Sequence, residues 1–177
     1  FSTENWKRPI KEVEGLLELF SNSISKESKK IHANKIKLKF IGDISIFTEP
    51  LQLKIKEIEK ETLRNKRLVL NVALNYGGRL DIVNSVNKFY QNKKKINKIT
   101  EKSINSGLYT KGQSDVDLLI RTGGQQRMSN FLLWQSAYAE LFFSKKLWPD
   151  FDEKVFVDAL YFFQNTERNF GSISKST

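Results

Sequence analysis

The run RTGGQQRMSN, residues 121–130, holds the side chains best suited to binding an anion. Arg121 and Arg127 flank two glycines, and Ser129 follows them. A guanidinium group can hold two phosphate oxygens at once, glycine lets a backbone N–H approach an anion closely, and a serine hydroxyl adds a donor. The pattern predicts a clamp for phosphate or diphosphate. A surface loop whose arginines form salt bridges accounts for the same residues, and the pattern leaves both interpretations open.

Glu140 is a carboxylate inside the apolar run FLLWQSAYAELFF, residues 131–143. A carboxylate in such surroundings is seldom buried unless it is paired with a cation or bound to a metal. Mg²⁺ is often held by one or two carboxylates together with phosphate oxygens and water, so Glu140 is a candidate ligand. An ion pair with a nearby arginine is the simpler alternative.

The first nine residues, FSTENWKRP, place polar side chains in front of an apolar pattern of helical spacing. Pro9 suits the start of a helix, where its missing N–H would have had no intrahelical partner. The polar residues are therefore interpreted either as caps of that helix or as a cluster that positions a substrate. The candidates for such a cluster are Ser2, Thr3, Glu4, Asn5, Trp6 and Arg8.

The spacing of apolar residues predicts helices and strands in alternation. Helices are expected from Pro9 to about Ala33, around residues 51–62 and 82–90, and from Glu153 onward. Strands are expected over residues 36–43, 67–75 and 116–124, the last two as buried strands. The run 131–143 is apolar throughout, which predicts a deeply buried segment or a partner interface. The lysine-rich NKKKINK, residues 92–98, is expected to be a solvated loop.

This alternation implies parallel crossovers, and therefore an α/β domain with a mostly parallel central sheet flanked by helices. In such sheets ligands gather at the carboxyl ends of the strands. NYGGR follows one predicted strand and RTGGQQRMS follows another, while FSTENW is expected to follow a strand that this sequence does not contain. The polar segments are thus expected at one edge of the sheet.

The composition limits the classes of protein and of site. The chain has 177 residues, of which 39% are hydrophobic, enough for one domain with a core. Its net charge of +10 favours anionic partners: nucleic acid, anionic lipid or phosphorylated small molecules. It contains no cysteine, which excludes disulfides and thiolate chemistry. No apolar run is long enough for a membrane-spanning helix, so a cytoplasmic or membrane-surface protein is expected.

Five segments together resemble the cis-prenyltransferase family, and within it the undecaprenyl diphosphate synthases of bacteria. They are FSTENWKRP, IGD, LNVALNYGGR, DLLIRTGGQQRMSNFLLWQSAYAELFF and LWPDF, and they occur in the family's order. The resemblance implies a single α/β domain over residues 1–177, with a hydrophobic tunnel for the growing chain, in a homodimer. The implied reaction condenses isopentenyl diphosphate onto an allylic diphosphate, commonly farnesyl diphosphate, with Mg²⁺. Its product is a lipid carrier for cell-wall building blocks that partitions into the membrane.

The resemblance also implies roles for particular residues. Arg121, Arg127 and Ser129 resemble the residues that hold the diphosphate of isopentenyl diphosphate. Arg8 resembles a further substrate-binding arginine, and the positions that match the lining of the substrate site are Ser2, Thr3, Glu4 and Trp6. Asn5 matches an asparagine proposed to help remove the proton after condensation. A neutral amide is a poor base, so Asn5 is expected to orient a water or a diphosphate oxygen that takes the proton. Glu140 matches a glutamate linked to Mg²⁺.

The sequence also departs from the family pattern. A strand ending in MDGNGRW, with an aspartate important for Mg²⁺, is absent, and Gln126 stands where some relatives have a histidine. The expectation is therefore the C-terminal portion of a complete enzyme, inactive by itself. One alternative is a non-catalytic partner subunit of the same fold. A basic nucleic-acid-binding domain is the more remote alternative, because no aromatic residues interleave the lysines of NKKKINK, and no nucleic-acid partner is expected.

Overall fold

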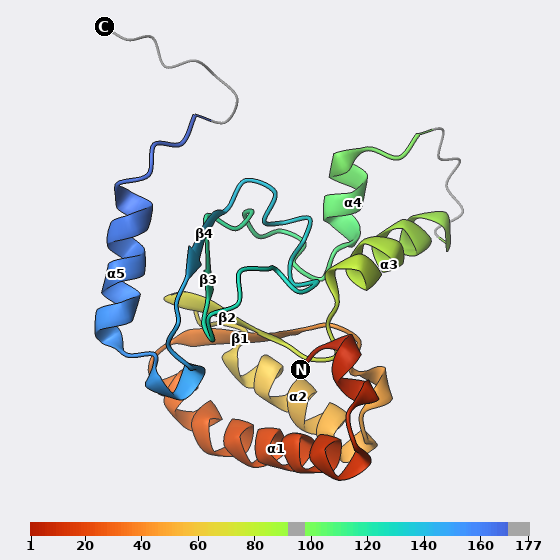
Figure 1. Cartoon of the computed structure of the whole chain (residues 1–177). Helices are drawn as coiled ribbons and strands as arrows, with labels where there is room; N and C mark the ends of the chain where they lie inside the picture. The colour runs from red at the N-terminus through yellow and green to blue at the C-terminus, as the bar shows by residue number, and fades with distance from the viewer. Residues whose placement is uncertain (92–97, 170–177) are drawn as a thin grey trace, which may run out of the picture. The chain divides into compact units, whose positions relative to one another are not determined.

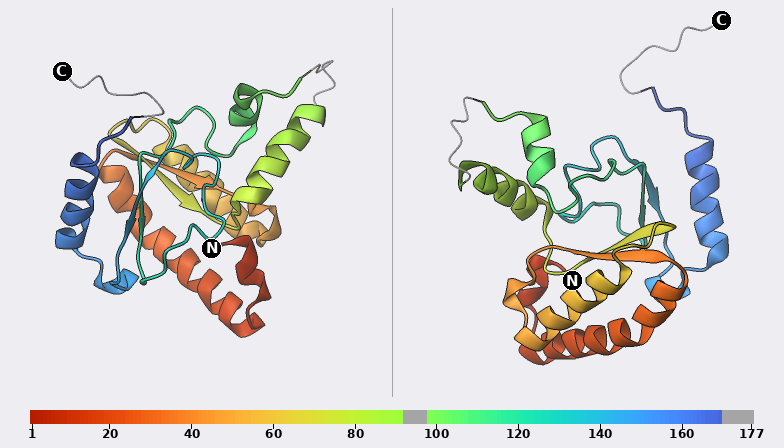
Figure 2. Two further views of the ribbon diagram at one scale, coloured as in Figure 1. Left: turned by 45° about the horizontal axis from the view of Figure 1, so that its top comes forward. Right: turned by 180° about the vertical axis from the view of Figure 1, so that it is seen from behind.

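The computed structural model describes residues 1–91 and 98–169 and divides the chain into two compact units, Phe1–Lys111 and Gly112–Thr177. Each unit is described by itself, and Figures 1 and 2 show the ribbon of both. The loop predicted over residues 92–98 lies, apart from Lys98, outside the described residues. The single domain over residues 1–177 stays a prediction.

The first unit is built on a parallel pair of strands. Its elements are η1 (Thr3–Lys7), α1 (Ile10–Ala33), β1 (Ile36–Ile41), η2 (Ile44–Ile46), α2 (Glu49–Thr62), β2 (Leu68–Ala73), α3 (Gly78–Gln91) and α4 (Glu101–Gly107), where η marks a 3₁₀ helix. β1 and β2 are parallel, and α2 lies between them in the chain as the crossover. Both α1 and α2 contact β1 and each other. They lie on the same side of the strand pair in front and rear views (Figures 1 and 2).

The core of the first unit lies between these helices and one face of the strand pair. Leu38 of β1 packs with Ile24 of α1 and Ile58 of α2. A second buried cluster continues toward the strand ends and contains Phe47, Leu51, Ile55 and Leu74. The helical spacing 51, 55, 58 and 62 thus marks the buried stripe of α2.

Side chains of α2 satisfy the backbone donors of β1 that point away from β2. Leu38 N donates to Thr62 Oγ1 at 3.1 Å, and Phe40 N donates to Glu59 Oε1 at 2.8 Å. Thr62 has no exposed surface, and its own hydroxyl donates to Ile58 O at 2.9 Å. A buried strand N–H without a partner is costly, so Thr62 joins strand and helix at a point that water does not reach.

We expect Thr62→Val to lower the free energy of unfolding by about 1–3 kcal/mol, because it keeps the shape but leaves Leu38 N–H unsatisfied. Denaturant unfolding of the two proteins measures the difference. Thr48→Val is the matched control, since Thr48 is exposed and its side chain makes no cap hydrogen bond. Its effect should stay within about 0.5 kcal/mol. Equal losses in both variants would contradict the assignment.

The second unit holds another parallel pair. Its elements are β3 (Leu118–Arg121), β4 (Glu140–Phe143), η3 (Trp148–Asp150) and α5 (Glu153–Gln164). α5 begins at its cap Asp152, whose Oδ1 accepts from Val155 N at 3.0 Å. The helix packs against β4, where the rings of Phe142 and Phe162 lie 5.6 Å apart.

The sequence predicted the helices α1, α2, α3 and α5 and the strands β1, β2 and β3. The helices from Pro9, around 51–62 and 82–90 and from Glu153 are confirmed, as are the strands and their parallel direction. The strands form two pairs, one in each unit. The elements that were not predicted are β4, the 3₁₀ helices and α4, although Thr100 and Ser103 form a capping box at the start of α4. In the described ranges no helix has the length and apolar character to cross a bilayer.

Two further differences from the sequence prediction concern burial. β2 is not buried at its start, where Leu68 is 54% exposed. The run 131–143 was expected to be deeply buried or to form a partner interface, and deep burial is wrong: only its last four residues form a strand, and Tyr138 is 70% exposed. Asn130 and Leu132 have positive φ values and turn the chain, so apolar composition did not translate into a buried element.

Candidate active site

Three polar segments of the first unit meet at the carboxyl ends of β1 and β2. Gly42 and Asp43 follow β1, Asn75 and Tyr76 follow β2, and the segment that begins η1 lies beside them. Asp43 N donates to Asn75 O at 3.3 Å, and Thr3 N donates to Tyr76 O at 3.2 Å. The expected gathering of FSTENW and NYGGR at strand ends is therefore confirmed for this unit.

The polar residues of FSTENWKRP organise η1 and leave α1 uncapped. Asn5 Oδ1 accepts from Ser2 N at 2.6 Å, while Pro9, at the N-cap of α1, makes no side-chain hydrogen bond. The capping interpretation thus applies to a 3₁₀ helix that the sequence did not predict. Because Oδ1 is used within η1, the group that Asn5 can offer to a ligand is the donor Nδ2.

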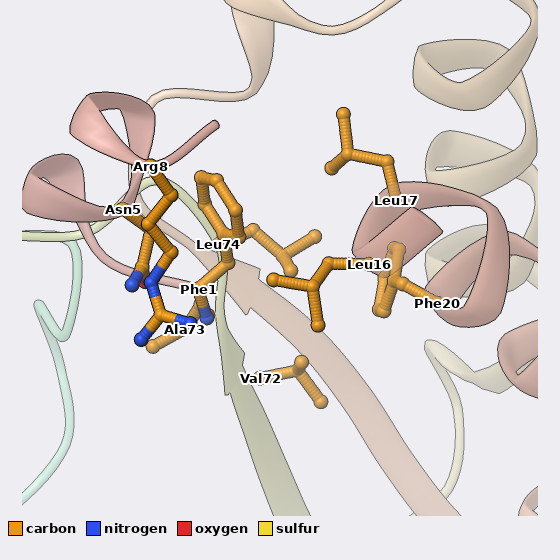
Figure 3. Close-up of a pocket in the computed structure, with 9 residues that line it drawn as sticks. All are labelled: Phe1, Asn5, Arg8, Leu16, Leu17, Phe20, Val72, Ala73 and Leu74. Carbon is orange, nitrogen blue, oxygen red and sulfur yellow. The ribbon is translucent and has the colours of Figure 1, made fainter. Parts of the chain in front are cut away.

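A pocket of about 390 Å³ opens beside η1 in the first unit (Figure 3). Its apolar walls come from the first residue, from α1 and from the end of β2. The lining residues are Phe1, Asn5, Arg8, Leu16, Leu17, Phe20, Val72, Ala73 and Leu74. Asn5 and Arg8 lie together on one side, across from the leucines and phenylalanine of α1 (Figure 3). The arrangement suits a molecule with an anionic head and an apolar tail.

Arg8 supplies the positive charge at this pocket. Its Nη1 lies 2.5 Å from Glu12 Oε1, and the two side chains are 49% and 46% exposed. An exposed pair of this kind contributes little to stability, so Arg8 can exchange Glu12 for a more highly charged phosphate group at small cost.

In the second unit, the loop after β3 is held by Arg121. Its Nη1 donates to the backbone oxygen of Arg127 and, at 2.7 Å, to Ser129 Oγ. Gly123 N donates to Lys146 O and Gly124 N to Ser144 O, at 2.7 and 2.9 Å. The expectation that the glycine N–H groups face an anion is therefore wrong for this conformation. Arg127 is the exposed cation of the loop.

Glu140 lies beside an arginine. Its Oε1 is 3.8 Å from Arg168 Nε, and Arg168 Nη1 also lies 2.8 Å from Asp117 Oδ1. The ion-pair alternative weighed for Glu140 is thus present in the structure. Over residues 1–91 and 98–169, no group of three or more His, Asp or Glu side chains could hold a metal ion. Glu140 is therefore one carboxylate without a group of further side-chain ligands of these types in the described residues, and Mg²⁺ often takes its other ligands from phosphate oxygens and water.

The sequence did not predict a buried hydrogen-bond network around Asp81, which joins the segment after β2 to the segment after α4. Asp81, 1% exposed, accepts from Tyr76 Oη at 2.9 Å and from Tyr109 N at 3.0 Å. Burial raises the pKa of Tyr109, a hydrogen bond from Asn84 lowers it, and the charges of Asp43 and Asp81 raise it further. An acidic residue in a first helical turn is common, and nothing in the sequence pairs Asp81 with a residue 28 positions away.

The predicted site residues are divided between the units. Ser2, Thr3, Glu4, Asn5, Trp6 and Arg8 lie in the first unit, and Arg121, Arg127, Ser129 and Glu140 lie in the second. In the second unit Arg121, Arg127 and Ser129 lie together at the loop after β3, whereas Glu140 begins β4 opposite Leu118, three residues before the strand position that pairs with Arg121. Their roles stay predictions.

Comparison with known proteins identifies the family. A family model described as "Putative undecaprenyl diphosphate synthase" matches residues 1–171. A ditrans,polycis-undecaprenyl-diphosphate synthase of Pasteurella multocida, described as (2E,6E)-farnesyl-diphosphate specific, is 50% identical over 97% of this chain and 73% of its own length. The chain belongs to the undecaprenyl diphosphate synthase family of cis-prenyltransferases.

Further relatives agree with this placement. The synthase of Yersinia pestis is 50% identical over 97% of this chain and 69% of its own length. A Campylobacter jejuni structure, described as a probable undecaprenyl diphosphate synthase, is 35% identical with a TM-score of 0.88, over 97% of this chain and 80% of that one. Lavandulyl diphosphate synthase from Lavandula x intermedia, in complex with dimethylallyl diphosphate, is 33% identical with a TM-score of 0.91, over 97% and 76%. The prediction of a prenyltransferase fold is confirmed.

Proposed function

We propose that this cis-prenyltransferase elongates an allylic diphosphate, farnesyl diphosphate, with isopentenyl diphosphate to make a long polyprenyl diphosphate. The observation that carries the proposal is the apolar pocket with Asn5 and Arg8 on one side, in a chain 50% identical to farnesyl-specific synthases. A phosphorylated lipid matches both the polar side and the apolar walls of this pocket. The walls from α1 and β2 are proposed as part of the tunnel for the prenyl chain.

The chemistry requires negative charge to be stabilised and a proton to be moved. The C–O bond of the allylic diphosphate breaks, with its electron pair leaving on diphosphate, as its carbon joins the terminal alkene carbon of isopentenyl diphosphate. This places positive charge on the second alkene carbon, and a proton then leaves C2, the CH2 group next to that charge, to form the new double bond. Arg8 would stabilise the charge that develops on a diphosphate at this pocket. Asn5 would donate Nδ2 to a diphosphate oxygen or a water that takes the proton, because its Oδ1 is already used by Ser2 N.

The loop after β3 is proposed to hold isopentenyl diphosphate. Arg121 fixes the loop from within by binding Arg127 O and Ser129 Oγ, which leaves the exposed Arg127 guanidinium to bind phosphate oxygens. Ser129 would add its hydroxyl to the same diphosphate. The substrate site is also proposed to be lined by residues of η1 and the residue before it: Thr3, Glu4, Trp6 and Ser2.

Mg²⁺ is proposed as the cofactor, with Glu140 as a ligand. Bound beside a diphosphate, the cation would neutralise charge on its oxygens. Glu140 would have to turn from Arg168, 3.8 Å away, toward that cation. Arg168 would keep Asp117 as a partner at 2.8 Å.

The proposal extends to assembly and location. We propose a homodimer that works in the cytoplasm or at the membrane surface, with a product that partitions into the membrane. Apolar side chains exposed on the second unit, such as Phe131 at 42% and Leu160 at 44%, support a partner interface. Light scattering in solution tests this: a mass of one chain at micromolar concentration would contradict the dimer.

The test of the activity uses the protein expressed from its complete coding sequence. Radiolabelled isopentenyl diphosphate, farnesyl diphosphate and Mg²⁺ are supplied, and the products are separated by chain length. We expect labelled polyprenyl diphosphates longer than the primer. A protein that is folded but incorporates no label would overturn the proposal.

We expect Glu140→Ala to raise the Mg²⁺ concentration for half-maximal activity by about tenfold or more, because a carboxylate ligand is lost. The matched control is Asp117→Asn, which removes the other carboxylate partner of Arg168 and leaves Glu140 in place. Its Mg²⁺ titration should match that of the unaltered protein. If the two variants shift alike, the effect comes from Arg168 and the metal assignment is wrong.

A further inference from the structure

We propose that Asn75 is a positioning residue for prenyl transfer, which acts by fixing Trp6 and with it the helix η1 that carries Asn5. The inference rests on the proposed function, because it assumes that Asn5 acts on the substrate. Asn75 follows β2 in the segment LNYGGR and is 6% exposed. A buried asparagine is costly unless both ends of its amide are bonded.

Both ends of the Asn75 amide are bonded to other segments. Trp6 Nε1 donates to Asn75 Oδ1 at 2.8 Å, and Asn75 Nδ2 donates to Asp43 O at 2.9 Å. One side chain therefore joins η1, the end of β1 and the end of β2. With one bond at its acceptor and one at its donor inside the protein, and only 6% of the residue exposed, this amide serves the scaffold.

The backbone at this point explains why the residue is an asparagine. Asn75 has φ +46°, in the left-handed region that glycine and asparagine tolerate and most residues avoid. Its neighbour Leu74 lies so close to Gly42 that a Cβ on residue 42 would sit 1.9 Å from Leu74 O. The ends of β1 and β2 thus form a close-packed base to which Asn75 attaches η1.

Trp6 is the link between this base and the catalytic candidate. Its ring lies against Phe1 and Phe47, with ring centroids 5.0 and 6.0 Å away, and its N–H is directed to Asn75. Asn5 is the adjacent residue on the same short helix. Without the Trp6–Asn75 bond, the start of η1 stays tied to Tyr76 O through Thr3 N, but its Trp6 end keeps the apolar ring contacts alone and can shift Asn5. Small displacements of reacting groups lower the turnover number strongly.

Two substitutions separate the effect of the Asn75 side-chain amide from that of the backbone conformation at residue 75. Asn75→Gly keeps the positive φ accessible and removes the amide, whereas Asn75→Asp keeps an oxygen that can accept from Trp6 Nε1. We expect Asn75→Gly to lower kcat by about tenfold with the KM for isopentenyl diphosphate changed by less than about twofold. Asn75→Asp should recover part of the lost kcat, because it restores the acceptor for Trp6 Nε1 and not the donor to Asp43 O. Trp6→Phe combined with Asn75→Gly should lose little more than the stronger single variant.

These outcomes distinguish positioning from general stability. An unchanged kcat in Asn75→Gly, or a KM that rises with the fall in kcat, would each overturn the proposal. Full additivity of Trp6→Phe and Asn75→Gly would also overturn it, because the two side chains would then act independently.

A second measurement does not depend on activity. The three tryptophans of this sequence each give an indole Nε1–H signal by NMR, and Trp6→Phe identifies the signal of Trp6. The Trp6 signal should exchange with solvent about tenfold faster in Asn75→Gly and at nearly the original rate in Asn75→Asp. Unchanged exchange in Asn75→Gly would overturn the link. If the unaltered enzyme shows no elongation, the proposed function fails, and this signal still tests the Asn75–Trp6 contact.

Discussion

Replacing Asn5 with aspartate is expected to lower kcat for chain elongation by about 10²–10³-fold, the usual effect of losing one well-placed donor to a developing charge. The aspartate keeps an oxygen for Ser2 N, which Asn5 Oδ1 binds at 2.6 Å, so η1 should keep its conformation. What disappears is the Nδ2 donor. The new carboxylate would also repel the diphosphate at the pocket that Asn5 and Arg8 line.

The measurement is steady-state kinetics with radiolabelled isopentenyl diphosphate, with circular dichroism to show that the variant is folded. Asn22→Asp is the matched control, because it introduces the same charge at an exposed position of α1 outside this pocket. We expect its kcat to stay within about twofold of the unaltered enzyme. A folded Asn5→Asp variant with a normal kcat would show that the Asn5 amide takes no part in the reaction.

The sequence could predict the elements of the fold because each leaves a local pattern. Leu51, Ile55 and Ile58 recur at helical spacing, and the buried stripe of α2 is the direct result. The start of β2 shows where this reasoning fails. Leu68 and Val69 are as aliphatic as the residues of a buried strand, yet they are 54% and 44% exposed, because burial depends on what packs against a strand.

The sequence could predict which segments form the site, but not which of their residues contact one another. Polar residues after predicted strands pointed to the strand ends, and FSTENW and NYGGR do meet there. The contacts that organise the site join residues far apart in the chain, such as Trp6 with Asn75, 69 positions away. Arg168, which lies beside Glu140, gave no signal of its own. Hydrogen-bond partners over such separations follow from the fold and leave no periodic trace in the sequence.

Arg127→Ala is expected to raise the KM for isopentenyl diphosphate by about 10- to 100-fold, because a hydrogen bond between charged groups is worth about 1.5–3 kcal/mol. The structure indicates that this substitution removes the guanidinium group without changing the conformation of the loop. Arg127 contributes its backbone oxygen to the internal bond with Arg121, and alanine keeps that oxygen. The loop should therefore persist while the exposed guanidinium is lost. The KM for farnesyl diphosphate should change by less than about threefold, because Arg127 is proposed to bind isopentenyl diphosphate.

The control must separate a local contact from the loss of one charge in a protein of net charge +10. Arg64→Ala removes the same charge from an exposed position just after α2 and should leave both KM values unchanged. Raising the salt concentration should weaken substrate binding in Arg64→Ala as it does in the unaltered enzyme, and less in Arg127→Ala, which has already lost the charged contact. If Arg127→Ala raises both KM values alike, the guanidinium acts through the general field of the protein, and the assignment of this loop to isopentenyl diphosphate is wrong.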